Sequence, residues 1–145
     1  MQAVQTIHII DDEVVIRISL QALLEAEGYV VQGHESVQSF LDTYLNGDFG
    51  CVVTDLYMPQ ISGLELMCEM SKLRVGVPAI VISGLMDARL SQASEEKGAF
   101  RCFQKPVDLY ALLVAIHAAL VHTYERNQNL AFPRGCIGVA DGPIG

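Results

Sequence analysis

The sequence predicts an α/β fold in which a parallel sheet of five strands is doubly wound, with helices on both of its faces. Short apolar runs, typical of strands buried on both faces, alternate five times with longer segments of helical period. This alternation is the pattern of βαβ units, and their right-handed crossovers place helices on both faces of the sheet. A length of 145 residues, 51% of them hydrophobic, suits one domain with a large core.

The first half of the chain holds three expected strands and two expected helices. The strands are Thr6–Ile10, Tyr29–Gln32 and Cys51–Thr54. The first helix covers residues 14–27 and is followed by Gly28, a residue favoured directly after a helix. Helical spacing gives this helix a buried face of Ile16, Leu20, Leu23 and Leu24. Ser36 can cap the second helix. The expected apolar face of that helix is Val37, Phe40, Leu41, Tyr44 and Leu45.

The second half of the chain adds three expected helices and two expected strands. The helices cover residues 63–74, 87–97 and 107–124, and the strands are Ala79–Ile82 and Phe100–Phe103. The helix over residues 87–97 is weakly apolar, with Leu90 and Ala93 as its main inward-facing candidates. Beyond a domain of residues 1–125, the periodicity stops. The glycines and prolines of residues 126–145 predict a linker-like or disordered tail.

Polar side chains stand at the carboxyl ends of four of these strands. Asp11 and Asp12 follow the first strand, Asp55 the third, Ser83 the fourth and Lys105 the fifth. The strand order 2-1-3-4-5 of flavodoxin-like sheets makes the first and third strands neighbours at the switch point where ligands bind. We therefore expect these side chains to converge. A simpler alternative treats Asp55 as a turn or capping residue and the earlier acids as charges at a helix N-terminus.

As a set, these residues suit phosphoryl transfer. Three carboxylates in one cleft repel each other, and a divalent cation removes the conflict. Mg²⁺ prefers a few carboxylate or carbonyl oxygens and keeps some of its waters, which suits phosphoryl groups. Lys105 offers a positive charge to a phosphoryl oxygen, and Ser83 offers a hydroxyl donor. Asp55 is then the candidate nucleophile that forms an aspartyl phosphate.

These motifs resemble those of the receiver domain of bacterial two-component response regulators, over residues 5–124. The matching pieces are Ile9-Ile10-Asp11-Asp12-Glu13, Asp55-Leu56-Tyr57-Met58-Pro59 with Ser62-Gly63, Ile82-Ser83-Gly84 and Lys105-Pro106. The branch that the chain most resembles is often joined to a DNA-binding helix-turn-helix domain. The resemblance implies a phosphorylation-controlled signalling switch in the cytoplasm. It implies no enzyme beyond, at most, slow self-dephosphorylation.

Individual roles also follow from the resemblance. Asp55 would accept the phosphoryl group from a phosphohistidine of a histidine kinase. Asp12, Asp55 and the backbone carbonyl of Tyr57 would bind Mg²⁺ directly, with Asp11 acting largely through water. The remaining implied features are phosphoryl binding by Ser83 and Lys105, movement of Ser83 on activation, and a cis peptide bond before Pro106.

The chain departs from the family pattern at Cys102, which stands three residues before Lys105, where the family has an aromatic switch residue. Phe100 and Phe103 lie on either side of Cys102, and both are expected to point to the opposite sheet face from it. The usual coupling, in which a hydroxyl shift lets an aromatic ring turn inward, is therefore expected to be weakened or rerouted. A milder departure is Val107, where an aromatic residue often follows the proline.

The last helix carries two apolar stripes. The stripe expected in the core is Leu109, Leu112, Leu113, Ile116 and Leu120; the second stripe is Tyr110, Val114, His117 and Val121. Because this fold leaves the outer side of the helix exposed in a monomer, the second stripe predicts a docking surface. We expect a homodimer or partner contact through the fourth helix, fifth strand and last helix. The alternative is that the tail folds back over this stripe.

Composition and residue spacing limit which other functions the chain can have. The net charge of −8 argues against nucleic-acid contact by this chain, since such surfaces are basic. We expect no membrane span or signal peptide. Neither cysteines nor histidines show metal-ligand spacing, so reduced thiols and structural or surface histidines are expected. Two alternatives remain: a phosphorylation-independent binding module on the same fold, suggested by Cys102, and a phosphohydrolase. Such hydrolases commonly need a second acid where this chain has Tyr57.

Overall fold

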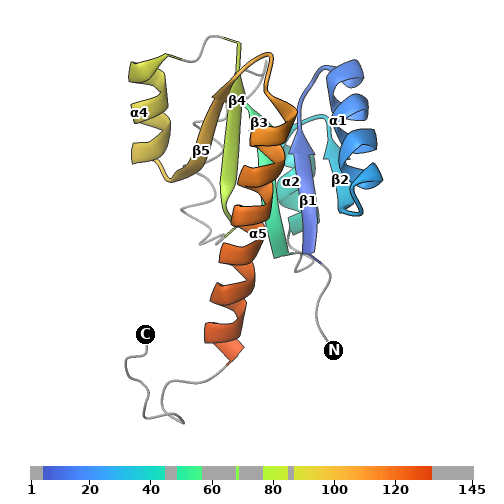
Figure 1. Ribbon diagram of the computed structural model, residues 1–145, viewed down its shortest axis with the longest axis vertical. Coiled ribbons are helices and arrows are strands. Elements are labelled where there is room, and N and C mark those ends of the chain that lie inside the picture. Colours follow the sequence, from blue (N-terminus) through green and yellow to red (C-terminus); the bar gives the residue numbers. More distant parts are fainter. Residues whose placement is uncertain (1–4, 45–48, 57–67, 69–76, 85–86, 132–145) are drawn as a thin grey trace.

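The centre of the molecule is a five-stranded sheet in the order β2-β1-β3-β4-β5, with every neighbouring pair parallel (Figure 1). The computed structural model describes residues 5–44, 49–56, 68, 77–84 and 87–131. The strands are β1 (Gln5–Ile10), β2 (Val30–His34), β3 (Phe49–Asp55), β4 (Ala79–Ser83) and β5 (Ala99–Gln104). The predicted parallel sheet and its strand order are confirmed.

Four helices are described in full: α1 (Val14–Ala26), α2 (Val37–Tyr44), α4 (Ala88–Glu96) and α5 (Leu109–Ala131). The helix predicted over residues 63–74 lies outside the described residues, apart from the helical Cys68. The last helix ends at Ala131, beyond the predicted end at Tyr124, because no glycine or proline interrupts residues 125–131. The remainder of the predicted tail, residues 132–145, also lies outside the described residues.

Local chemistry sets the ends of α1 and α4. Gly28 and Gly98 follow these helices with φ angles of 96° and 103°, a left-handed conformation that favours glycine. At the start of α4, the Asp87 carboxylate accepts a hydrogen bond of 2.8 Å from the backbone N–H of Leu90. This bond satisfies one of the amide donors that a helix N-terminus leaves unpaired.

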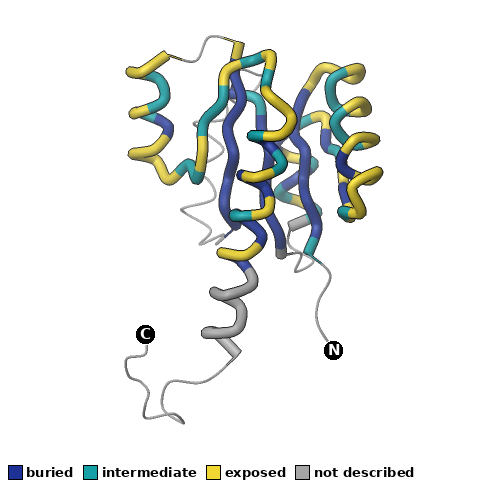
Figure 2. The backbone as a smooth tube through the Cα atoms, viewed as in Figure 1, coloured by how far each residue is buried: buried dark blue, intermediate teal, exposed yellow. Residues whose placement is uncertain are grey.

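The sheet separates two apolar layers. One layer packs under α1 and α5 and includes Ile7, Ile9 and Ile116; the other packs under α2 and α4 and includes Phe40 and Val81. Figure 2 shows the inner strands β1, β3 and β4 buried, whereas the edge strands β2 and β5 and the helices carry half-buried and exposed residues as well. This arrangement explains why the inner strands are rich in apolar residues, since helices cover both of their faces.

Two residues predicted for the core are exposed. Leu23 on α1 is 45% exposed and Leu109 on α5 is 42% exposed. Both line a small cavity of about 80 Å³ between these helices, together with Leu20 and Leu113. Their helical spacing was read correctly, but a neighbouring helix does not close over them. The predicted Tyr44 and Leu45 contacts lie outside the described side chains.

The second stripe of α5 is exposed as predicted. Tyr110 is 75% exposed, Val114 51% and Val121 42%, and His117 is also exposed. Within the described part of the chain, no helix has the length and apolar character needed to cross a bilayer.

The described cysteines carry free thiols. Burial raises the pKa of Cys51 to about 12, so its thiol stays protonated and unreactive at neutral pH. Cys68 and Cys102 are half-buried, and Cys136 lies outside the described residues.

Candidate functional site

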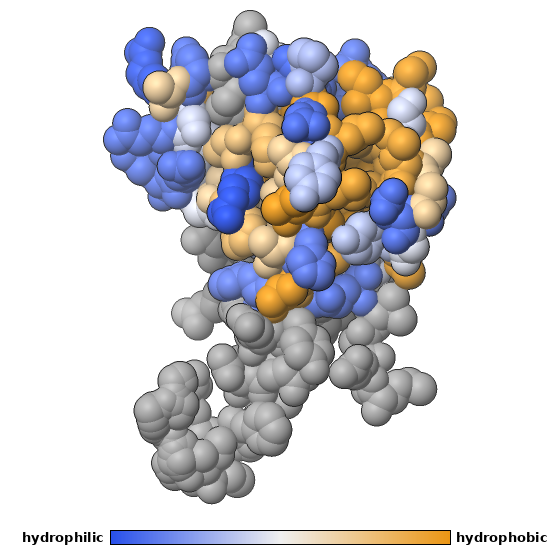
Figure 3. Space-filling model, viewed as in Figure 1, coloured by the Kyte–Doolittle hydropathy of each residue, from blue (hydrophilic) through white to orange (hydrophobic). Residues whose placement is uncertain are grey.

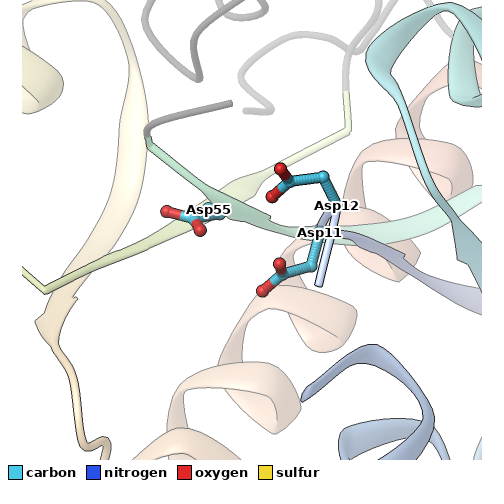
Figure 4. A group of neighbouring side chains, drawn as sticks. All are labelled: Asp11, Asp12 and Asp55. Carbon is cyan, nitrogen blue, oxygen red and sulfur yellow. The ribbon is translucent and has the colours of Figure 1, made fainter. Parts of the chain in front are cut away.

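Three carboxylates meet at the carboxyl edge of the sheet. Asp11 and Asp12 directly follow β1, and Asp55 is the last residue of β3. Pairing of Ile10 with Thr54 brings these two strand ends into register. One ligand oxygen from each acid lies within 4.8 Å of the other two, and Figure 4 shows the carboxylates gathered at the strand ends. The convergence predicted for these acids is confirmed.

Lys105 reaches this cluster from the end of β5. Its Nζ lies 3.1 Å from Asp55 Oδ2 and 3.5 Å from Asp11 Oδ2. A third carboxylate, that of Glu13, lies 3.7 Å away. The backbone N–H of Lys105 donates a 2.8 Å hydrogen bond to the Ser83 carbonyl. Main chain and side chain of one residue therefore tie together the ends of β1, β3, β4 and β5.

The position of Asp11 is fixed by the turn that follows β1. Its Oδ1 accepts a 2.9 Å hydrogen bond from the Glu13 backbone N–H, and its own N–H donates to the His34 carbonyl at 3.2 Å. The Arg17 guanidinium donates to the Asp11 carbonyl at 2.6 Å. These contacts hold a buried acid in one geometry, which a binding site needs.

The electrostatics of the cluster are dominated by negative charge. Burial raises the pKa of Asp11, and the nearby Asp55 charge adds to this effect; together they outweigh the opposing Glu13 hydrogen bond and Lys105 ammonium. For Lys105, burial alone lowers the pKa. The hydrogen bond to Asp55 and the negative charges of Asp11 and Asp55 raise the pKa by more than burial lowers it, so the net shift is upward. Lys105 is therefore firmly charged at neutral pH.

Comparison with known proteins identifies the family. The model of the response regulator receiver domain matches residues 7–117. The chain belongs to this family. Receiver domains are the signalling-switch modules of two-component response regulators.

Individual relatives agree with the family match. The chain is 38% identical over 122 residues to the transcriptional regulatory protein FixJ of Azorhizobium caulinodans, covering 84% of this chain and 58% of that protein. It therefore spans little more than half the length of this relative. The low-resolution structure of the response regulator StyR has a TM-score of 0.83 and 30% identity, and the match covers 89% of this chain and 65% of that one. The beryllofluoride-activated receiver domain dimer of NtrC4 has a TM-score of 0.76 and 25% identity, with 81% and 98% coverage.

The donor set of this receiver domain fits a magnesium ion. Asp11 is 3% exposed, and the Asp55 side chain is 10% exposed, whereas Asp12 is open to solvent. Two sheltered carboxylates and one exposed carboxylate give a hard cation a few oxygen ligands and leave room for water, as Mg²⁺ requires. Tyr57, whose backbone carbonyl was predicted as a further ligand, lies outside the described residues.

The two predicted phosphoryl-binding residues of the receiver domain are neighbours. Ser83 is fully buried at the end of β4, and the Lys105 N–H is bonded to its carbonyl. The peptide bond between Lys105 and Pro106 is cis, as expected from the family. The contact of each side chain with a phosphoryl group stays a prediction.

The position predicted to depart from the family pattern lies on β5. Cys102 packs toward α2 and α4, with its thiol 3.9 Å from the Ser91 carbonyl, and Phe100 and Phe103 pack on the opposite face. The predicted opposite placement is confirmed, but alternation was the wrong reason for Phe100, because strict alternation would put it on the same face as Cys102, two residues away. A register shift between β4 and β5 explains the difference, since Ala79 pairs with Ala99 but Ile80 pairs with Arg101.

Sequence reasoning missed two contributors to this site. Glu13 was not assigned a role in the site, yet its carboxylate lies 3.7 Å from Lys105 Nζ. Arg17 was not considered, and it holds the Asp11 carbonyl from one turn into α1. Both follow Asp11 closely in the chain, and that proximity to a predicted ligand was the available signal.

Proposed function

We propose that this receiver domain takes a phosphoryl group from the phosphohistidine of a histidine kinase onto Asp55. A carboxylate oxygen of Asp55 attacks phosphorus, the bond from phosphorus to the histidine nitrogen breaks, and an aspartyl phosphate forms. The observation that supports this most directly is the 3.1 Å contact between Lys105 Nζ and Asp55 Oδ2 beside two further acids. This contact puts a fixed positive charge where phosphoryl oxygens would gather.

The other site residues have supporting roles in this proposal. Asp12, Asp55 and the Tyr57 carbonyl would hold Mg²⁺ directly and Asp11 largely through water, and the bound ion would neutralise charge on the phosphoryl oxygens. Lys105 pairs with one phosphoryl oxygen, and Ser83 donates to another and moves on activation. Water attacks the acyl phosphate slowly, so the domain resets itself without being an enzyme toward other molecules. A helix over residues 63–74 completes five helices around the sheet.

Replacing Asp55 tests the acceptor assignment. We expect Asp55→Asn to abolish phosphate uptake from acetyl phosphate with Mg²⁺, because an amide oxygen is too weak a nucleophile. Intact-protein mass spectrometry would detect the phosphorylated species. Asp87→Asn, which alters a carboxylate that caps α4 outside the site, is the matched control and should be phosphorylated normally. Undiminished uptake by Asp55→Asn would refute the assignment.

We further propose that phosphorylation acts on a homodimer formed through α4, β5 and α5. Support comes from the exposed stripe of Tyr110, Val114 and Val121 on α5 and from the dimeric state of the NtrC4 receiver domain. A large exposed apolar stripe is costly unless a partner covers it. FixJ is named as a transcriptional regulator, so we propose that the whole protein regulates transcription in the cytoplasm through a DNA-binding output domain.

A second candidate, a binding module that ignores phosphorylation, is favoured by Cys102, because a half-buried thiol replaces the family's aromatic switch. Beryllofluoride with Mg²⁺ separates the two functions. If the domain is a switch, we expect the analogue to raise the dimer fraction in sedimentation velocity by severalfold, and Val114→Asp to block that rise. Ile18→Asp, an exposed apolar position on α1, is the control and should dimerise normally. A dimer fraction that does not change when beryllofluoride is added would favour the phosphorylation-independent binding module.

A further inference from the structure

A cavity of about 450 Å³ lies between α1 and the sheet, directly beside the acidic cluster. Its walls are mainly apolar and come from α1, from β1, β3 and β4, and from Pro106 and Val107 after β5. Gaps left by ordinary packing rarely exceed the size of a few waters, whereas binding pockets for small molecules span roughly 300–1,000 Å³. The volume is therefore that of a ligand site.

Exposed and half-buried residues of α1 form one wall of this cavity. Val15 and Leu23 are 76% and 45% exposed, and Leu20 is half-buried. Figure 3 shows apolar side chains gathered on this side of the molecule, over α1 and the first turns of α5. An apolar ligand can therefore enter from solvent without opening the core.

One end of the same cavity is charged. Asp11, Asp55 and Lys105 line it, together with Thr54 of β3. The Lys105 ammonium is already shared among three carboxylates, those of Asp11, Glu13 and Asp55. Two lining acids against one lining base leave a surplus of negative charge, which favours a cationic ligand group and disfavours an anionic one.

We propose that this cavity binds a lipophilic amine: an apolar body under α1, with an ammonium group against Asp11 and Asp55. The ammonium group occupies space that a divalent cation would need, so the two ligands exclude each other. Such an amine holds the domain in a form that cannot be phosphorylated. The inference goes beyond the phosphoryl-transfer proposal, and binding of the amine does not require that proposal to be correct.

The test is titration of the full chain with phenylbutylamine, without Mg²⁺, by calorimetry and by amide chemical shifts. We expect saturable binding with shifts at α1 and at the ends of β1 and β3. Phenylbutanol, which lacks the charge, and ethylamine, which lacks the apolar body, should each bind about tenfold or more weakly, and phenylbutyrate should bind weakest. Equal or tighter binding of the alcohol or the acid would overturn the proposal.

Variants of the protein locate the ligand. Ser19→Phe fills the cavity from an exposed position and should weaken amine binding about tenfold or more. Ile18→Phe is the matched control: it lies next to Ser19, is 58% exposed and does not line the cavity, so binding should be unchanged. Equal losses in both variants would overturn the proposal.

The charged end has its own pair of variants. Asp55→Asn should weaken amine binding about tenfold. Lys105→Gln removes a like charge beside the ligand ammonium and should tighten binding about fivefold, an effect that damage to the fold cannot produce. Unchanged or weaker binding by Lys105→Gln would overturn the proposal. All these titrations omit Mg²⁺, so a failure of the magnesium or phosphorylation proposal leaves their outcome interpretable.

Discussion

The two faces of the sheet differ in how completely they are filled around β1. Toward α2, the rings of His8 and His34 stack with centroids 5.2 Å apart, and Phe40 packs edge-on against both, 5.1 Å and 5.7 Å away. Toward α1, the same strand lines a cavity of about 450 Å³. One strand therefore has a close-packed side that stabilises the fold and an open side that leaves room next to Asp55. Rigidity and access to the site are therefore supplied by opposite faces of the sheet.

The largest expected loss of stability comes from removing a side chain on the close-packed α2 side of the sheet. Phe40 is fully buried between α2 and the sheet, so Phe40→Ala should lower the free energy of unfolding by about 3–5 kcal/mol. Chemical denaturation followed by circular dichroism would measure the loss. A change below about 1 kcal/mol would mean that this face is no better packed than the α1 face.

An intermediate effect comes from acid. Burial, with the charges of His8 and Arg17, lowers the pKa of His34 to about 4 from 6.5. A lowered histidine pKa gives stability that is fully present above pH 6.5 and is lost as the pH falls toward 4, on the order of 3 kcal/mol. Unfolding free energies measured across this window should fall less steeply for His34→Gln. Parallel curves for the two proteins would show that His34 is not the group responsible.

The smallest expected effect lies on the open face. Leu23 is 45% exposed and already borders empty space, so Leu23→Ala should cost less than about 1 kcal/mol. The same denaturation experiment measures it, with Leu24→Ala as the matched control. Leu24 is its neighbour but is 2% exposed, so this variant should lose about 2–4 kcal/mol. Similar losses for both leucines would remove the difference between filled and open packing.

These leucines also show how far sequence can predict the fold. Helical spacing predicted that Leu20, Leu23 and Leu24 share one face of α1, and all three do lie on the side of the helix that faces the sheet and α5. Period alone carries no information on the distance to the next helix, so it could not foresee that Leu23 and Leu109 border a cavity. The end of α5 was predicted too early because the apolar pattern, and not the helix, stops near Tyr124.

The site was more predictable than the packing. Asp11, Asp55 and Lys105 each follow a recognisable buried strand, and parallel strands place such residues at one edge of the sheet whatever the details of packing. Phe100 was predicted to face away from Cys102, and it does, but the cause is a register shift that alternation does not supply, because a bulge depends on how two strands pair. Likewise, the contact between His8 and His34 joins two strands whose register no single run of sequence specifies.

Lys105 gives this edge of the sheet a resident counterion. Its ammonium already neutralises part of the charge of Asp11 and Asp55. Any cation that binds these carboxylates must therefore compete with a side chain that cannot diffuse away. If the ammonium moved toward a newly bound anion, the hydrogen bond from the Lys105 backbone N–H would transmit that movement to the Ser83 carbonyl. A ligand that binds at Asp11 and Asp55, at the ends of β1 and β3, would thereby also affect the end of β4. Lys105 therefore connects these strands mechanically as well as by its charge.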